Sequence, residues 1–286
     1  MPTKKAPAEA KFALHRIMVA MDSSVHAQAA AEAAVGLAVR FEAVVEGLFV
    51  EDVNLINLAE HPVGRLVSFP SGMAGTLDRG ALERYIRNEC RSAQRALETV
   101  ANRRGLRAGF RILRGRVDSE IFAAASEADL LVLGLAGRSG SSRGRPGSVA
   151  LAAAERAPGS VLIYRTGVSP SGNPLLCFDG LHGSVKALDA AISLPRENNH
   201  EIRVALIPSE AFTVTALRER VEELLSDRGL NASFVECAPQ NLDQLCKFAA
   251  SAGTNAIVLA AKSPVLQGEG LRRILADANC PLLLVR

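Results

Sequence analysis

The sequence predicts an α/β protein made of two tandem parallel open sheets with helices on both faces. Short apolar runs of strand length alternate with segments of helical periodicity along the whole chain, which is typical of consecutive βαβ units. The second half then repeats the pattern of the first. At 286 residues the chain is long enough for two domains that each bury a core.

Five strands are expected in the first half, with helices in the intervals between them. The apolar runs that predict these strands cover residues 15–21, 43–50, 109–114, 130–135 and 160–165. The clearest helix precedes Gly105, which is expected to end it. Its apolar residues recur at helical spacing and predict a buried stripe of Leu82, Ile86, Ala93, Leu97 and Val100.

An internal repeat supports the division into two halves. The segment IMVAMDSSVHAQAAAEAAVGL aligns with PLLCFDGLHGSVKALDAAISL, which places Asp22 opposite Asp179 and Val35 opposite Ile192. Further along, ADLLVLGLAGRSG aligns with TNAIVLAAKSPV, and AERAPGSVLIYR aligns with LADANCPLLLVR. Each half therefore begins and ends alike.

The repeat sets the expected domain boundaries. A disordered lead-in over 1–12 precedes a first domain over 13–167, and a linker rich in turn-forming residues over 168–173 precedes a second domain over 174–286. The first half also carries an extra stretch centred on 51–80.

Composition excludes several classes of protein. A formal charge of +3 without clustering argues against nucleic acid as a partner. No apolar run approaches the roughly 20 residues of a membrane helix, and no signal-peptide pattern follows the first lysines, so we expect a cytoplasmic protein without a membrane partner. The five cysteines lack a CxxC pair, and His15, His26 and His61 lack metal-ligand spacing. We therefore expect reduced core thiols and neither a disulfide framework nor a metal site.

A glycine-rich segment, GLAGRSGSSRGRPGS, follows the fourth predicted strand and precedes a helix. It places Gly134, Gly137 and Gly147 in the pattern G-x2-G-x9-G-S, which ends at Ser148. Glycines allow main-chain N–H groups to close around an anion, and the positive end of the following helix adds to that field. Charged side chains of the same loop would also face the anion: Arg138, Arg143 and Arg145. The segment therefore predicts a phosphate site.

A flexible surface loop is the alternative interpretation of this segment. Glycine, serine and arginine also compose linkers, and Ser148 would serve as the N-cap of any helix. Neither GxxxxGK[ST] nor GxGxxG occurs, which argues against a Walker A loop and against a dinucleotide fingerprint.

These features together resemble the ATP-binding subclass of the universal stress protein family. The similar parts are the glycine pattern after ADLLVLG, an aspartate that ends the first strand, GLFVED in the second strand, and VLIYR as a closing strand. The resemblance implies a Rossmann-like, adenine nucleotide alpha hydrolase-like fold with five parallel strands. Its first and fourth strands are neighbours at the switch point, so Asp22 and Gly134 would face one crevice.

The same resemblance implies the residues that bind ATP, with Mg²⁺. Asp22 and the backbone of Val50 would hold the adenine and ribose, and Ser23 is a further expected binding residue. The phosphates would be surrounded by Gly134, Gly137, Arg138, Gly147, Ser148 and Val149. Two alternatives stay open: Asp22 would also suit the N-cap of the next helix, and the 51–80 stretch would cover either the adenine side or a partner surface.

The second half is expected not to bind ATP. Ala260 and Ser263 replace Gly134 and Gly137, and the connection to the last helix is shorter. Glu269 stands opposite Ser148, where its carboxylate would gain about 0.3–1 kcal/mol from the helix dipole and repel phosphate.

Family resemblance also implies pairing of two such domains through their last strands. VLIYR and PLLLVR are therefore the expected contact strands of an intramolecular pseudo-dimer, and whole chains could pair further as a homodimer.

The sequence thus favours a nucleotide-dependent regulatory module of the stress response, with one ATP site and an unidentified protein partner. No catalytic residue is assigned, because no motif supplies a general base, metal ligands or a P-loop lysine. Two alternatives remain. One is a slow ATPase or self-phosphorylating protein that uses Ser139, Ser141, Ser142 or Ser148. The other is a structural pseudo-dimer that binds nothing.

Overall fold

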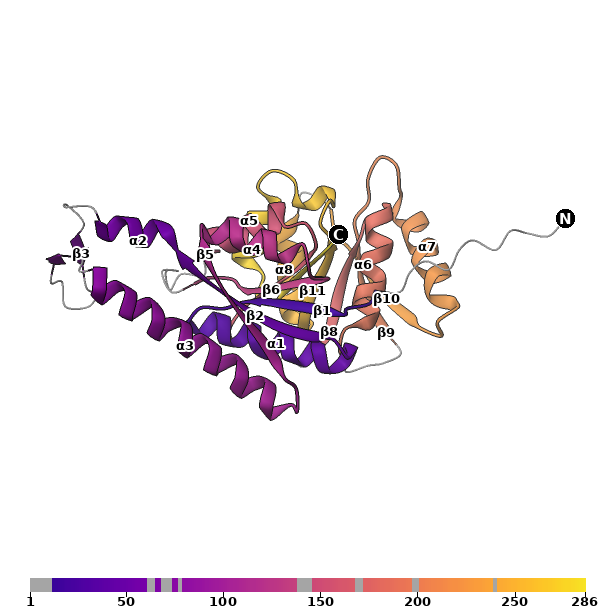
Figure 1. The fold of residues 1–286 in the computed structure, drawn as a ribbon. Coiled ribbons are helices and arrows are strands. Elements are labelled where there is room, and N and C mark those ends of the chain that lie inside the picture. Colours follow the sequence, from indigo (N-terminus) through magenta and orange to yellow (C-terminus); the bar gives the residue numbers. More distant parts are fainter. Residues whose placement is uncertain are drawn as a thin grey trace.

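The fold is known from a computed structural model of the chain (Figure 1). The structure describes residues 12–60, 65–67, 74–76, 79–137, 146–167, 172–196, 201–238 and 241–286. Most of the expected lead-in and the expected linker residues 168–171 lie outside these ranges, so the domain boundaries stay predictions.

The first half contains a parallel sheet of five strands in the order β7-β6-β1-β2-β5. The strands are β1 (Arg16–Ala20), β2 (Val44–Asp52), β5 (Ala108–Gly115), β6 (Leu130–Gly134) and β7 (Ser160–Tyr164). Each coincides with an apolar run from which it was predicted. The predicted neighbourhood of the first and fourth strands is confirmed, since β1 pairs with β6 on one side and β2 on the other.

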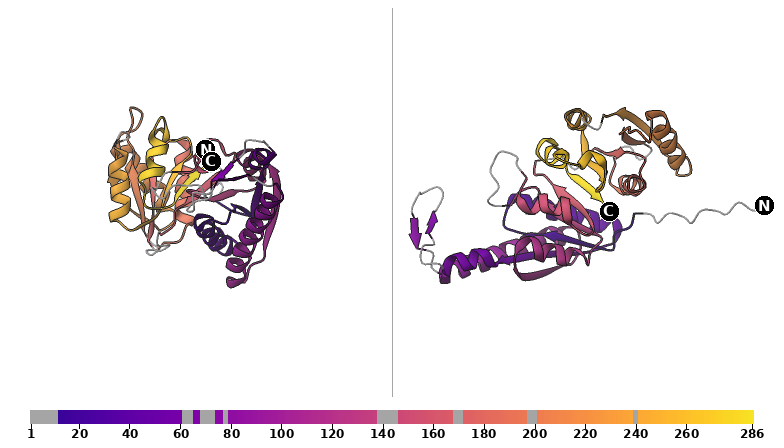
Figure 2. Two further views of the ribbon diagram at one scale, coloured as in Figure 1. Left: turned by 90° about the vertical axis from the view of Figure 1, so that its left-hand side faces the viewer. Right: turned by 90° about the horizontal axis from the view of Figure 1, so that it is seen from above.

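The second half repeats this strand order as β10-β9-β8-β11-β12. Its strands are β8 (Asn173–Phe178), β9 (Glu201–Leu206), β10 (Asn231–Glu236), β11 (Thr254–Ala260) and β12 (Leu282–Val285). β12 pairs with β7 in antiparallel register, with Leu283 opposite Leu162. The predicted contact between VLIYR and PLLLVR is therefore confirmed, and the two halves lie side by side as one ten-stranded sheet (Figure 2).

Helices cover both faces of the sheet, as predicted. Successive strand residues point to opposite faces, so Ile17 and Val19 of β1 belong to one hydrophobic cluster and Met18 to the other. The first cluster is completed by α1 (Val25–Phe41), α3 (Arg79–Arg103), α6 (His182–Ser193) and α7 (Val214–Ser226). The second is completed by α4 (Val117–Ala125), α5 (Ser148–Arg156), α8 (Leu242–Ser251) and α9 (Gly270–Asp277).

The predicted stripe before Gly105 is the buried face of α3. All five of its predicted residues are buried against the first cluster. Gly105 follows the helix with a φ of +70°, a left-handed conformation that glycine adopts without steric cost. The beginning of α3 projects beyond the sheet together with α2 (Val53–Glu60) and a hairpin of β3 (Arg65–Val67) and β4 (Ala74–Thr76) (Figure 1).

The predicted burial of the thiols is confirmed, because Cys90, Cys177, Cys237, Cys246 and Cys280 are all buried, and each is free in the structure. In the described ranges, no helix combines the length and the apolar character needed to cross a bilayer.

Candidate functional site

A cleft of about 1170 Å³ lies at the carboxyl ends of the first half's strands. Met21 and Asp22 follow β1, Val50 and Asp52 end β2, and Gly134 ends β6. In an open parallel sheet the crevice outside the carboxyl ends, at the point where strand order reverses, is where ligands bind. β1 and β6 are the strands at that point, so the cleft occupies the position that the fold favours for a ligand.

Most of the predicted site residues line this one cleft. They are Asp22, Val50, Gly134, Gly137, Gly147, Ser148 and Val149. Ser23 is outside the lining, and its hydroxyl donates a hydrogen bond to the Glu89 carboxylate on α3, so its role in binding stays a prediction. Arg138 lies outside the described residues, as do Arg143 and Arg145.

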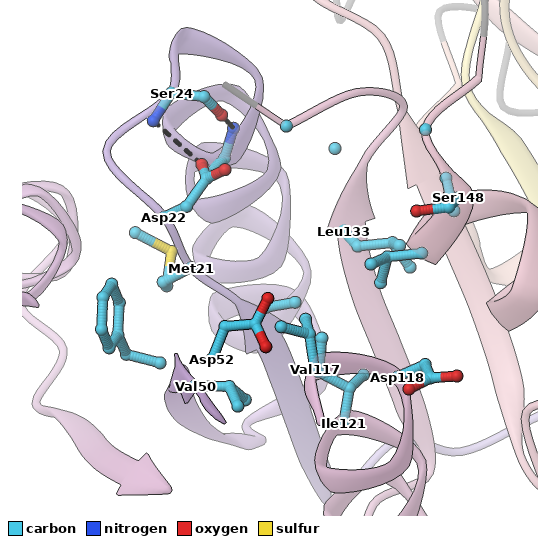
Figure 3. Close-up of a pocket in the computed structure, with 18 of the residues that line it drawn as sticks. Met21, Asp22, Ser24, Val50, Asp52, Val117, Asp118, Ile121, Leu133 and Ser148 are labelled. Carbon is cyan, nitrogen blue, oxygen red and sulfur yellow. Dashed lines mark hydrogen bonds between the residues drawn. The ribbon is translucent and has the colours of Figure 1, made fainter. Parts of the chain in front are cut away.

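Asp22 is folded back toward the start of α1 (Figure 3). Its Oδ1 accepts a hydrogen bond of 2.9 Å from the Ser24 N–H. Ser24 itself is the N-cap, and its Oγ accepts 3.1 Å from the Ala27 N–H. The alternative of Asp22 as N-cap is therefore wrong, and its Oδ2 lies beside Gly137, where an added β-carbon would be 3.0 Å away.

The glycine segment ends in an open helix start. Gly147, not Ser148, is the N-cap of α5, and Ser148 is the first helical residue, so the alternative of Ser148 as N-cap is wrong. Gly147 has no side chain to accept from the first N–H groups of the helix, and no capping bond from a side chain is found there among the described residues. The Gly147 N–H donates 2.8 Å to the Leu135 carbonyl, which fixes the end of the loop beside β6. The N–H groups of the first turn are therefore available to an anion in the cleft.

The presence of glycine at residue 134 is explained by helix packing as well as by its place in the cleft lining. A β-carbon at Gly134 would lie 2.7 Å from the His26 Cβ and 2.8 Å from its carbonyl carbon, so only glycine lets α1 approach β6 this closely.

The cleft also contains charged residues that sequence reasoning missed. Asp52 points toward its middle (Figure 3), and Asp118 at the start of α4 lies 3.7 Å from Arg116 Nε and 4.0 Å from an Arg156 terminal nitrogen. The sequence contained a signal for both aspartates, since Asp118 comes shortly after the third predicted strand and Asp52 shortly after the second. Polar residues at those points gather at the same edge of a parallel sheet.

An apolar wall closes one side of the cleft. It is formed by Met21 directly after β1, Phe49 and Val50 from β2, Leu55 from α2, and Tyr85 and Ile86 from α3. The described start of the 51–80 stretch therefore lines the cleft, and both of its expected roles stay predictions.

The corresponding place in the second half is filled by a hydrogen bond. Ser263, the counterpart of Gly137, donates 2.7 Å from its hydroxyl to Asp179 Oδ2, while Asp179 Oδ1 accepts 3.0 Å from the Leu181 N–H. Asp179 and Ser263 are only 3% and 2% exposed. Glu269 occupies the N-cap position of α9, and its side chain makes no capping hydrogen bond.

The family model described as "Universal stress protein family" matches residues 13–165, which include every strand that borders the cleft. The chain belongs to the universal stress protein family. A universal stress protein from Archaeoglobus fulgidus DSM 4304 shares the fold at a TM-score of 0.70 and 14% identity, over 95% of this chain and 98% of that one. A Pseudomonas aeruginosa UCBPP-PA14 protein described as a universal stress protein superposes at 0.55 and 14% identity, over 96% of this chain and 94% of that one. Among curated proteins, nothing matches the sequence.

Proposed function

We propose that this universal stress protein binds one ATP, with Mg²⁺, in the cleft of its first half, and that the second half is a degenerate copy that binds none. The protein would then report nucleotide level to a partner as a stress-response regulator. The observation that carries the proposal is the meeting of Gly137, the Asp22 carboxylate and the uncapped start of α5 in one cleft.

The polar end of the cleft suits a phosphate chain. Main-chain N–H groups at the start of α5 supply donors, and the helix dipole favours negative charge there. Gly137 leaves room beside Asp22, since even a β-carbon would come within 3.0 Å of its Oδ2. The Ser148 hydroxyl adds a further donor at the helix start.

The carboxylates of the lining favour a magnesium-bound nucleotide over a bare one. Asp22, Asp52 and Asp118 would each repel free ATP across a cleft of this size. Mg²⁺ bound to a nucleotide takes its ligands mainly from phosphate and water, with only one or two carboxylates. This fits the described residues, among which no group of three metal-ligating side chains is found.

The apolar wall suits the adenine. Met21, Val50 and Leu55 offer the kind of apolar surface on which a base would lie. The backbone of Val50, at the end of β2, would provide the hydrogen bonds that recognise the base edge.

Calorimetric titration of the full chain with ATP and magnesium tests the proposal. We expect one site per chain and a dissociation constant of about 1 μM, about −8 kcal/mol. Gly137→Glu should abolish binding, because the new carboxylate would enter beside Asp22, while thermal unfolding stays as in the wild type. Gly36→Glu on α1 is the matched control, since it adds the same charge where nothing lies within 4 Å and outside the cleft lining. Two sites, or unaltered binding by the Gly137 variant, would contradict the proposal.

Ser148 supports a second candidate function, a slow ATPase or self-phosphorylating protein. Its hydroxyl lines the cleft at the helix start where we place the phosphates. Phosphate release and transfer of label from γ-labelled ATP to the protein measure this activity. Ser148→Ala should remove the label on the protein if the hydroxyl is the acceptor, and leave it if another serine is.

A further inference from the structure

Two arginines connect the halves in a reciprocal arrangement. Arg165 follows β7 in the first half, and its terminal nitrogen donates 2.9 Å and 3.0 Å to the carbonyls of Leu275 and Ala276 at the end of α9. Arg286 follows β12 in the second half, and donates 2.9 Å to the Gly159 carbonyl and 2.5 Å to the Ala154 carbonyl at the end of α5. Each half therefore caps the last helix of the other half.

The two capped helices differ in what lies at their other end. α5 begins at Ser148 in the cleft, whereas α9 begins at Gly270, in the half where Ser263 and Asp179 are hydrogen-bonded to each other. The two arginines thus hold corresponding positions and both donate to carbonyls at the end of the other half's last helix, yet only Arg286 holds a helix whose start faces the proposed ligand.

α5 depends on such contacts for its position. It has nine residues, fewer than the roughly 12–15 that an isolated helix needs to be even marginally stable in water. Its far end accepts hydrogen bonds from Arg286, whose backbone N–H also donates 3.2 Å to Ser160 Oγ. A cation at the carboxyl end and an anion at the amino end of a helix each interact favourably with the same dipole. Arg286 therefore acts on the orientation of the helix that carries the N–H groups in the cleft.

We infer that Arg286 is a positioning residue for the nucleotide site, so that the degenerate second half holds the phosphate-binding helix of the first. This inference rests on the proposed ATP site and deepens it. It assigns the second half a role in binding without a ligand of its own, and it makes nucleotide occupancy and the docking of the two halves mutually dependent.

The test compares two variants that each remove one reciprocal cap. Arg286→Ala and Arg165→Ala both break hydrogen bonds between the halves, so they control for a general loosening of the interface. Titration with magnesium and ATP should show binding weakened about 10-fold by Arg286→Ala, in the usual range of coupling between sites. Arg165→Ala should stay within about two-fold of the wild type, and Arg286→Lys, which keeps the charge, should recover part of the loss.

The outcomes distinguish a failure of the proposed ATP site from a failure of the role inferred for Arg286. Wild-type protein that fails to bind ATP overturns the ATP site and this inference together. Wild-type binding with equal affinities for the two alanine variants overturns this inference alone.

A measurement on the unmodified protein covers the case in which Arg286→Ala fails to fold. Hydrogen exchange with saturating magnesium and ATP should slow at residues 153–157, where α5 ends, and at 282–286 in β12, by more than at 274–278 in α9. Protection confined to residues 147–151 would contradict a connection through Arg286.

Discussion

Gly134 and His26 are in such close contact that the two positions cannot both carry a β-carbon in this backbone. A β-carbon at Gly134 would lie 2.7 Å from the His26 Cβ. In the second half the roles are exchanged: Ala260 carries the β-carbon, and the counterpart of His26 is Gly183, whose added β-carbon would lie 3.0 Å from that of Ala260. The replacement of Gly134 by Ala260 in the repeat is therefore compensated in the packing of the helix against its strand.

The first prediction concerns this exchange. Gly134→Ala should destabilise the protein by about 1–3 kcal/mol, as expected for overpacking against a backbone that cannot yield cheaply. Adding His26→Gly removes the contact with the His26 Cβ but leaves the 2.8 Å contact with the carbonyl carbon of residue 26, so it should recover only part of that loss. Urea unfolding of both single variants and the double variant measures the coupling.

His26→Ala is the control for this cycle. It removes the ring, including the contact between Nδ1 and Thr166 Oγ1 at 3.2 Å, but keeps the β-carbon. It should therefore not rescue Gly134→Ala. Equal rescue by alanine and glycine at residue 26 would show that the ring, and not the β-carbon, is what Gly134 avoids.

The second prediction is that Gly137→Ser closes the first cleft in the manner of the second half. A serine hydroxyl there would stand beside Asp22 Oδ2 and form the counterpart of the 2.7 Å bond between Ser263 and Asp179. ATP affinity should fall at least about 10-fold, because a phosphate would have to displace that bond, at a cost typical of a hydrogen bond to a charged group. Gly137→Ala adds the β-carbon without the hydroxyl and should weaken binding less. Titration of both variants decides, and an equal loss would mean that volume alone closes the site.

The strands could be predicted from the sequence, and so could Asp22 and Gly134 as residues that face the cleft, because their signals are local. Apolar runs mark buried parallel strands, and the repeat shows where the glycine pattern is lost. The caps were harder to assign, since Asp22, Ser23 and Ser24 are three adjacent residues that all suit an N-cap. Only the backbone geometry assigns the cap to Ser24 and turns Ser23 toward Glu89.

Other features depend on contacts between distant segments. Asp118 and Arg156 meet in the cleft although no short motif contains both, and their separation in sequence conceals the pair. The same holds for Arg286 and Ala154, which come from opposite halves of the chain. The closure by Ser263 is similar, because its hydrogen bond to Asp179 requires β8 and β11 to be neighbours. A sequence pattern predicts secondary structure elements and the residues at which strands end. Only the fold shows which residues from distant segments are in contact.

The third prediction concerns the charge of the cleft. Asp118 lies near both Arg116 and Arg156, so its carboxylate competes with phosphate for the two guanidinium groups. Asp118→Asn should strengthen ATP binding about 3- to 5-fold at low salt, and the gain should shrink as salt screens the charges. Asp227→Asn, which removes a charge from an exposed position at the end of α7, controls for net charge. Weaker binding by the Asp118 variant would instead indicate that this carboxylate holds the magnesium ion.

The fourth prediction is that the buried thiols make the protein sensitive to alkali. Burial, with a smaller contribution from Cys246, raises the pKa of Cys280 to about 12 from an ordinary value of 9.0. Below pH 9 the thiol is protonated in both states and its contribution to stability is complete. Above that pH the unfolded chain loses the proton while the folded chain keeps it, so the free energy of unfolding falls by about 1.4 kcal/mol per pH unit and per thiol until the folded pKa is passed. Cys280→Ala should therefore lower the free energy of unfolding at about pH 8. Between about pH 9 and 10.5, however, the free energy of unfolding of this variant should fall less steeply than that of the wild type, as measured by urea unfolding. Identical slopes in the variant and the wild type would mean that other groups, such as Tyr164, whose pKa is raised by burial and by Glu32, cause the alkaline loss.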